Sequence, residues 1–328
     1  MSNQIPELSF IEIEKGDSYS INLLKAALSD HGFFSITEHG LSKELVDNCY
    51  ESSKAFFDLD YEIKNTYSSV GSKGARGYTP KGIETAVGEK IADQKEFWHH
   101  GPVIDDSFDK KIPQNLNIEQ VPQFNSNFDE LYNELHKIGS RVLSVIALSL
   151  GLDSDYFSSW VEKGNSLLRS IHYPPVESLS NPHRARAHED INLITLLIGA
   201  EEGGLEVLNK DGSWIKVEPS SEAIVCNIGD MMQLVTDKKL KSTTHRVMQD
   251  TDTEPKSRYS IPFFLHPAPS INLKSIFRDD DKGILADTFL NQRLKEIKLY
   301  WYGYIYYLTN NNWFYWVDYY CDTTFRKL

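Results

Sequence analysis

Residues 187–197 read AHEDINLITLL, in which His188 and Asp190 stand directly before a run of leucine and isoleucine. In an extended segment, residues two apart point to the same face, so both polar side chains leave the chain on one side. A carboxylate that is buried without a partner is costly, by several kcal/mol. The pair can present one nitrogen and one oxygen to a single metal ion, which would compensate for its burial.

This stretch lies in a half of the chain that is rich in short β-type runs. From about residue 166 onward, clusters such as EEGG, NKDG, EPSS and TDKK separate the runs, as turns do between antiparallel strands. We predict strands at SLLRSIHY (166–173), INLITLLIG (191–199), LEVL (205–208), SWIKVE (213–218), EAIVCNIG (222–229), MMQLVT (231–236), KSTTHRV (241–247) and RYSIPFFL (258–265). Many short strands at this spacing indicate a sandwich or a barrel.

The N-terminal half has a helical pattern instead. We predict helices over 18–32, 42–57 and 123–150, a short strand at FFSIT (33–37), and irregular chain over most of 71–122. Helices first and strands later, without alternation, argue against a parallel dinucleotide-binding sheet. The sequence also has no G-x-G-x-x-G motif and no P-loop.

Composition narrows the class of protein. The 328 residues, 40% hydrophobic and 25% charged, suit a globular protein with a substantial core. A net charge of −13 argues against a nucleic-acid partner, which needs a basic face. Three widely spaced cysteines suit a reducing compartment. No secretory signal or membrane-length apolar run stands in the main body, so we expect a cytoplasmic monomer without a membrane span.

Two downstream histidines could complete the site begun by His188 and Asp190. His266 stands between Leu265 and Pro267, which suits a loop better than a ligand, whereas His245 lies in an alternating strand and is the better candidate. Two histidines and one carboxylate leave three positions open, as in non-haem Fe(II) oxygenases. An H-x-D pair also occurs by chance, so a surface histidine and an ordinary aspartate are the alternative.

A second pair follows thirteen residues after His245. Arg258 and Ser260 are two apart, so they share one strand face. A guanidinium beside a hydroxyl can hold one carboxylate. The alternative is an arginine whose stem covers the end of a barrel while its head reaches solvent. The ordered set H-x-D, His and R-x-S is much more specific than any of its parts.

With these motifs the sequence resembles the 2-oxoglutarate/Fe(II) dioxygenase superfamily, in its isopenicillin-N-synthase-like branch. The similarity covers about residues 4–299 and includes IPELSF, HGFFSITEHGLS, RGYTP, KEFWHHG, HYPP, HEDINLITLL, GGLEVL, WIKVEP, NIGDMMQLVTDKKLKSTTHRV and RYSIPFF. It implies a mainly β fold with flanking helices, a double-stranded β-helix (distorted jelly roll) wrapped by N-terminal α-helices. The expected single oxygenase domain, 1–299, has an N-terminal helical and lid part (1–122), a helical spine (123–165), a jelly-roll core (166–270) and a C-terminal helix (271–299).

The resemblance also implies roles for single residues. Matched one by one, the iron ligands are His188, Asp190 and His245, and the residues that hold 2-oxoglutarate are Arg258, Ser260 and Tyr173. Ile171 departs from the family, which commonly has asparagine there. Glu189 stands where many plant members have Thr or Ser, which is consistent with a bacterial relative.

The implied enzyme uses Fe(II), O2 and 2-oxoglutarate as co-substrate. It forms succinate and CO2 while it hydroxylates or otherwise oxidises a C–H bond of a small-molecule substrate. Two alternatives stay open. One is a 2-oxoglutarate-independent Fe(II) oxidase of the isopenicillin-N-synthase or aminocyclopropane-carboxylate-oxidase type, and the other is a non-catalytic binding module on the same fold.

Substrate contacts are expected beside the metal. The candidates are Arg76, Tyr78, Phe97, Trp98, Arg184, Arg186 and Phe264. Core packing is the alternative for the aromatic residues, and solvated salt bridges are the alternative for the arginines. An arginine that faces the metal would indicate an acidic group on the substrate, so we expect a small amino-acid-like or carboxylate compound.

The last 29 residues, 300–328, differ in composition from the rest. Thirteen of them are aromatic, against 39 in the whole chain. An aromatic belt at a membrane surface is one interpretation of these residues, and a frame-shifted or read-through coding origin is the other. We predict that truncation after Leu299 leaves iron binding intact, measured as iron content and succinate release. Loss of activity in a truncated protein that still folds would contradict this prediction.

Overall fold

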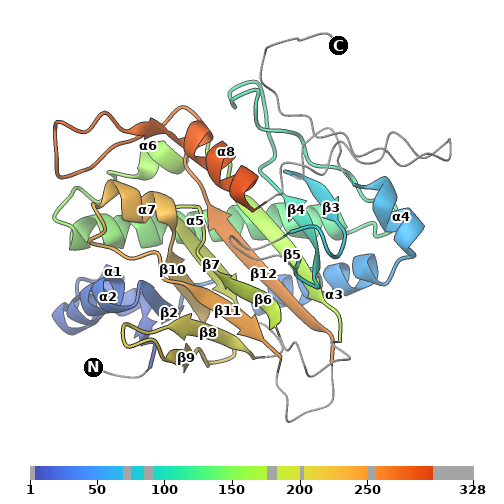
Figure 1. The fold of residues 1–328 in the computed structure, drawn as a ribbon, viewed down its shortest axis with the longest axis horizontal. Coiled ribbons are helices and arrows are strands. Elements are labelled where there is room, and N and C mark those ends of the chain that lie inside the picture. The colour runs from blue at the N-terminus through green and yellow to red at the C-terminus, as the bar shows by residue number, and fades with distance from the viewer. Residues whose placement is uncertain are drawn as a thin grey trace, which may run out of the picture.

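Two sheets of mostly antiparallel strands form the centre of the molecule, shown in the computed structural model of Figure 1. The structure describes residues 4–68, 75–84, 92–175, 183–199, 203–249 and 256–297. The larger sheet has the order β1-β2-β10-β7-β12-β5-β4-β3, and the smaller one the order β6-β11-β8-β9. The smaller sheet lies in front of the larger in Figure 1. This is the mainly β jelly-roll fold that the sequence predicts.

The strands of the larger sheet are β1 (Glu7–Ser9), β2 (Phe33–Thr37), β3 (Gly77–Thr79), β4 (Glu96–His100), β5 (Leu167–Tyr173), β7 (Ile194–Ile198), β10 (Ile224–Ile228) and β12 (Arg258–Leu265). The smaller sheet has β6 (His183–His188), β8 (Leu205–Leu208), β9 (Trp214–Lys216) and β11 (His245–Met248). A separate hairpin pairs β13 (Asn272–Leu273) with β14 (Ile284–Leu285). The helices are α1 (Phe10–Glu14), α2 (Ser18–Asp30), α3 (Lys43–Phe57), α4 (Tyr61–Thr66), α5 (Phe124–Ser149), α6 (Ser158–Val161), α7 (Asp230–Val235) and α8 (Ala286–Glu296).

The N-terminal part of the chain adds strands to the large sheet as well as helices around it. β2 pairs with β10, with Phe33 opposite Asn227, and β4 pairs with β5. β3 and β4 lie within the stretch predicted to be mostly irregular. Because these strands continue the sheet, the N-terminal part shares a core with the strands that follow it.

The long helix α5 confirms the helix predicted over 123–150 and covers one face of the large sheet. It contacts α3 and the strands β4, β5, β7 and β12. Its buried residues recur every three or four positions: Phe124, Phe128, Leu131, Tyr132, Leu135, Ile138, Gly139, Val142, Leu143, Ile146 and Ala147. This apolar stripe supplies the burial that holds the helix against the sheet.

The strand prediction at MMQLVT (231–236) is wrong, because the segment forms α7. The chain turns there because the backbone N–H of Asp230 donates to the carbonyl of Asp190 at 2.7 Å. A side chain at Gly229 would also collide with the backbone and side chain of Asn192, so only glycine permits this close approach. In the turned segment the buried residues are Met231, Met232 and Val235, which share one side of a helix.

Two other elements differ from expectation. Strand β6 has the polar sequence HRARAH and pairs only with β11 among the described strands, so it lacks the apolar alternation that sequence analysis uses. The C-terminal helix predicted over 271–299 is limited to α8, because the β13–β14 hairpin takes up the first part of that range.

The extension 300–328 lies outside the described residues. No helix in the described part of the chain is long and apolar enough to cross a membrane.

Candidate metal and co-substrate site

A pocket of about 950 Å³ opens among β5, β6, β11, β12 and α8. All six residues assigned from the sequence to iron and 2-oxoglutarate line it, namely Tyr173, His188, Asp190, His245, Arg258 and Ser260. Three of the lining residues, Leu290, Leu294 and Ile297, come from α8 and the residue just after it. The predicted ligands and the predicted clamp therefore share one cavity, although they come from different strands.

His188, Asp190 and His245 form one compact cluster. His188 ends β6 and His245 begins β11, and the two residues stand opposite each other in the register of these antiparallel strands. One nitrogen or oxygen of each residue lies within 4.8 Å of the corresponding atoms of the other two. Nε2 of His245 is 3.8 Å from Oδ1 of Asp190. No other trio of His, Cys, Asp or Glu comes together in this way within the described ranges.

Both imidazole rings are oriented by backbone carbonyl groups. Nδ1 of His188 lies 2.7 Å from the carbonyl oxygen of Arg186, and Nδ1 of His245 lies 3.1 Å from that of Thr243. Since a carbonyl oxygen can only accept, each Nδ1 must carry the proton and donate it. The lone pair of each ring is then on Nε2, as a metal ligand requires.

The protonation states also suit a metal. Burial, reinforced by the charge of His245, lowers the pKa of His188 to about 4, so this ring is neutral at neutral pH. Burial alone would raise the pKa of Asp190, but His245, His188 and two hydrogen bonds outweigh it and hold that pKa below its usual value. Two imidazole nitrogens and one carboxylate oxygen are the donor set of non-haem Fe(II) sites, so these residues fit that ion.

The clamp residues begin strand β12. Arg258 and Tyr173 are register partners between β12 and β5, and the guanidinium carbon lies 5.2 Å from the centre of the tyrosine ring. Nε of Arg258 donates to the carbonyl of Gly203 at 3.2 Å. Ser260 stands opposite Ile171 in the same register. Arg258, Ser260 and Tyr173 are all buried, so a carboxylate held here is shielded from water.

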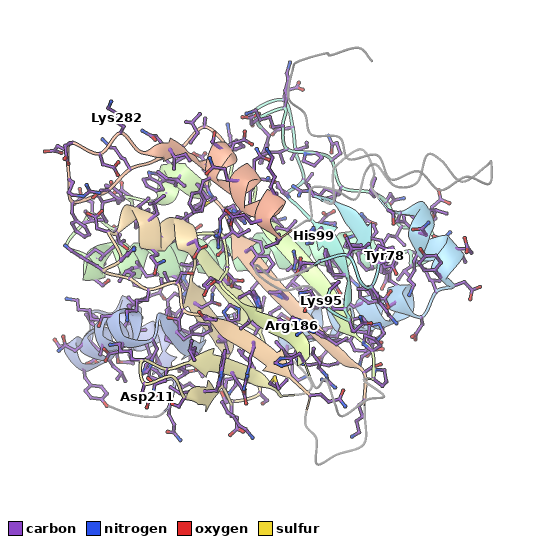
Figure 2. All side chains as sticks on the ribbon, in the orientation of Figure 1. Tyr78, Lys95, His99, Arg186, Asp211 and Lys282 are labelled. Carbon is purple, nitrogen blue, oxygen red and sulfur yellow. The ribbon has the colours of Figure 1, made fainter. Side chains whose placement is uncertain are left out.

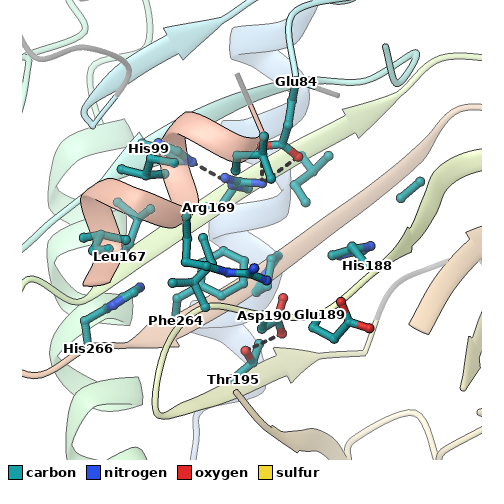
Figure 3. Close-up of a pocket in the computed structure, with 18 of the residues that line it drawn as sticks. Glu84, His99, Leu167, Arg169, His188, Glu189, Asp190, Thr195, Phe264 and His266 are labelled. Carbon is teal, nitrogen blue, oxygen red and sulfur yellow. Dashed lines mark hydrogen bonds and ion pairs between the residues drawn. The ribbon is translucent and has the colours of Figure 1, made fainter. Parts of the chain in front are cut away.

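A network of charged side chains on the pocket wall was missed by sequence reasoning. Arg169 of β5 lies between Glu84 and His99 (Figure 3), pairing with the Glu84 carboxylate at 3.1 Å and with Nε2 of His99 at 2.6 Å. Lys95 bridges Glu84 at 2.6 Å and Asp93 at 2.8 Å. One signal existed in the sequence, because Arg169 is a lone charge inside the apolar run SLLRSIHY.

The seven substrate candidates divide into two groups. Arg76 and Phe264 line the pocket. The other five are not among the residues that line it: Tyr78 and Trp98 pack against Phe56, Phe97 lies under the Arg169 guanidinium, Arg184 donates to the Lys256 carbonyl, and Arg186 lies beside Asp93. Figure 2 labels Tyr78, Lys95 and Arg186, of which the last two both pair with Asp93.

His266 also lines the pocket, in the loop predicted for it after β12. Burial lowers its pKa to about 4, so the ring is neutral. It is not part of the cluster formed by His188, Asp190 and His245. The preference for His245 over His266 as the third ligand therefore agrees with the geometry.

Comparisons with known proteins fit this geometry. Residues 164–267 match the family described as the 2OG-Fe(II) oxygenase superfamily, and residues 7–123 match the one described as non-haem dioxygenase in morphine synthesis N-terminal. A 2-oxoglutarate-dependent dioxygenase of Didymella fabae is 30% identical over 83% of this chain and 89% of its own length.

Two solved structures extend the comparison. The crystal structure of a 2OG-Fe(II) oxygenase family protein from Caulobacter crescentus has a TM-score of 0.81 and 41% identity, covering 90% of this chain and 99% of that one. A full-length Neurospora crassa protein, solved in complex with alpha-KG and thymine, has a TM-score of 0.77 and 27% identity, covering 89% and 96%.

Proposed function

The chain belongs to the 2OG-Fe(II) oxygenase superfamily, and we propose that His188, Asp190 and His245 hold its Fe(II). It is a dioxygenase that couples decarboxylation of 2-oxoglutarate to oxidation of a small molecule, with Fe(II) and O2. The observation that carries the ligand assignment is the free donor set, Nε2, Nε2 and Oδ1, converging within one pocket.

Arg258, Ser260 and Tyr173 are proposed to hold the distal carboxylate of 2-oxoglutarate. The support is their burial together at the wall of the same pocket, where a charge-assisted hydrogen bond is strong. Arg258 presents a planar fork and Ser260 a hydroxyl from the same face of β12. In the Neurospora crassa structure the corresponding compound is alpha-KG, which is 2-oxoglutarate.

The chain's own residues bind and orient the reactants, and they exclude water. When bound, Fe(II) with 2-oxoglutarate and O2 supplies the oxidising power, and 2-oxoglutarate leaves as succinate and CO2. Arg258 orients the co-substrate by pairing with its far carboxylate. Leu290, Leu294 and Ile297 place apolar surface at the pocket, which keeps water from the reacting groups.

The relatives favour this function over the two alternatives from the sequence. Several of them are named 2-oxoglutarate-dependent dioxygenases, and the six proposed metal and clamp residues are all present here. The deciding experiment measures succinate while the protein, with Fe(II) and 2-oxoglutarate, is exposed to a library of metabolites. Substrate-stimulated succinate is expected. Substrate oxidation with O2 uptake and no succinate would indicate the oxidase, and iron binding without O2 uptake would indicate the binding module.

The proposed substrate is a small polar molecule. The pocket is lined by apolar side chains such as Phe264 and Leu294 and by charged ones such as Arg76, Arg169 and Glu84. Arg76 supports the acidic substrate expected from the sequence, because its guanidinium lies at the pocket wall, where it could pair with an acidic group. This guanidinium donates to Asn165 at 3.0 Å. The thymine complex of the Neurospora crassa protein supports a compact polar substrate in this type of pocket.

Phe264 is the substrate contact that we expect to matter most. It stands opposite Thr195 in the register of β12 and β7, and Thr195 hydrogen-bonds Asp190, so the ring lies beside the metal site. Phe264→Ala should raise the substrate KM about tenfold or more, because truncating an aromatic side chain that contacts a bound ligand removes roughly 2 kcal/mol of binding. Affinity for 2-oxoglutarate should stay within about twofold. A Phe157→Leu variant, altered in the core away from the pocket, is the control, and an unchanged substrate KM in Phe264→Ala would exclude this contact.

A cytoplasmic location and a monomeric state also remain our proposals. Cys49 and Cys226 are free, buried thiols, which is consistent with a reducing compartment. Cys321 lies outside the described residues. Fractionation of cells and light scattering of the purified protein would test the two proposals separately.

A further inference from the structure

The carboxylate of Asp190 accepts hydrogen bonds from two uncharged side chains. Its Oδ2 accepts a hydrogen bond from Thr195 Oγ1 at 2.6 Å and a second from Asn227 Nδ2 at 2.8 Å. Thr195 on β7 and Asn227 on β10 stand opposite each other in the register of the two strands. Neighbouring strands therefore aim both donors at the same oxygen, as the labelled Thr195 and Asp190 in Figure 3 show for one of them.

The Thr195 donor is itself fixed. Asn192 donates through Nδ2 to Thr195 Oγ1 at 3.0 Å and to the carbonyl of Ile194 at 2.9 Å. Because Thr195 Oγ1 accepts this bond, its own proton is left to point at Asp190. Asn192, Thr195 and Asn227 are all at least 96% buried, so water does not compete for these bonds.

The two oxygens of Asp190 thus have different surroundings. Oδ2 has two hydrogen bonds, while Oδ1 faces Nε2 of His245 at 3.8 Å, on the side of the proposed ligands. A carboxylate oxygen has two lone-pair sites, and both of those on Oδ2 are taken. A metal that bound through both oxygens would have to displace a buried donor and leave it unsatisfied, which is unfavourable.

We propose that Thr195 and Asn227 are positioning residues that restrict Asp190 to one-oxygen binding of the metal. This inference rests on the proposed function, in which Asp190 is a ligand. A carboxylate that binds through both oxygens would occupy one further coordination position. One-oxygen binding keeps that position available, so the two donors preserve the three sites that co-substrates need.

The test uses the full chain loaded with Mn(II) in place of iron, without O2. The number of water molecules on Mn(II) is read from water-proton relaxation and from broadening of the Mn(II) magnetic resonance signal in ¹⁷O-water. Three variants are compared with the wild type: Thr195→Val and Asn227→Leu, which keep shape and remove a donor, and Thr195→Ser, which keeps the hydroxyl. Thermal unfolding shows that each variant is folded.

In Thr195→Val and Asn227→Leu we expect one water fewer than in the wild type and a weaker binding of 2-oxoglutarate. Turnover should fall by about 10- to 100-fold, the usual effect of losing a ligand's hydrogen-bond partner. Thr195→Ser, which keeps the hydroxyl, should have the wild-type water number and the wild-type 2-oxoglutarate affinity. An unchanged water number in folded Thr195→Val and Asn227→Leu would overturn the proposal, even if metal affinity fell, because a merely structural role predicts that pattern.

The same series separates this inference from the function on which it rests. Asp190→Ala must lose Mn(II) if Asp190 is a ligand at all. Retention of Mn(II) with an unchanged water number in Asp190→Ala would contradict the assignment of the metal site itself. Loss of Mn(II) in Asp190→Ala, together with unchanged water in Thr195→Val and Asn227→Leu, would leave the metal site in place and overturn only the positioning role.

Discussion

Asp190→Ala is expected to abolish iron binding and turnover together. Asp190 is the one anionic donor of the cluster with His188 and His245. With it, Fe(II) keeps one positive charge, on which dianionic 2-oxoglutarate can bind. Without it, neither histidine can supply the lost negative charge, since His188 is neutral. The measurements are iron content after anaerobic loading and succinate release.

Asparagine variants make this comparison sharper. Asp190→Asn keeps the shape of the side chain and removes its charge, and it should also fail to retain iron. Asp93→Asn is the matched control, because Asp93 is another buried carboxylate of the same pocket and pairs with Lys95. It should keep its iron. Full iron content in Asp190→Ala would show that the ligands are misassigned.

Arg258→Ala should leave iron in place and weaken 2-oxoglutarate by roughly thirtyfold to several-thousandfold, because breaking a charge-assisted pair in a desolvated site costs about 2–5 kcal/mol. Arg258 is 2% exposed and packs beside Tyr173, so water cannot replace its charge easily. Arg258→Lys should recover only part of the affinity, since one ammonium does not reproduce the planar fork. The assay is anaerobic titration of the Fe(II)–2-oxoglutarate charge-transfer absorption.

Arg169→Ala provides the control for Arg258. Arg169 lines the same pocket but pairs with Glu84 and His99, on the side assigned to substrate. Its removal should change substrate KM and leave the 2-oxoglutarate titration nearly unchanged. If Arg258→Ala bound 2-oxoglutarate as tightly as the wild type, the clamp would be misassigned, and the 2-oxoglutarate-independent oxidase would become the better reading.

The site residues closest to the chemistry were predictable because each motif is short. In AHEDINLITLL and RYSIPFF, two polar residues stand two apart beside an apolar run, and period-two alternation predicted that each pair shares one face. The third ligand needed a choice between two histidines, and alternation favoured His245. The large-scale change from helical to β pattern likewise predicted the fold, and α5 and most of the strands followed.

Local patterns failed where tertiary contacts decide. MMQLVT forms a helix because the chain after Gly229 hydrogen-bonds to Asp190 and the loop that follows it. These contacts outweigh the local preference of the residues for a strand. HRARAH forms a strand without apolar alternation because its pairing with β11 supplies the hydrogen bonds.

By itself, then, the sequence determined the type of fold, the metal ligands we propose and the pair proposed to hold 2-oxoglutarate. Only the tertiary structure decided which distant residues become neighbours. Glu84, Lys95 and Arg169 meet on one wall although they belong to separate segments. Thr195 and Asn227 reach the same carboxylate oxygen because β7 and β10 pair in one register. Periodicity shows which face a side chain occupies, but the register between strands, and so its partner across the sheet, is fixed by packing of the whole chain.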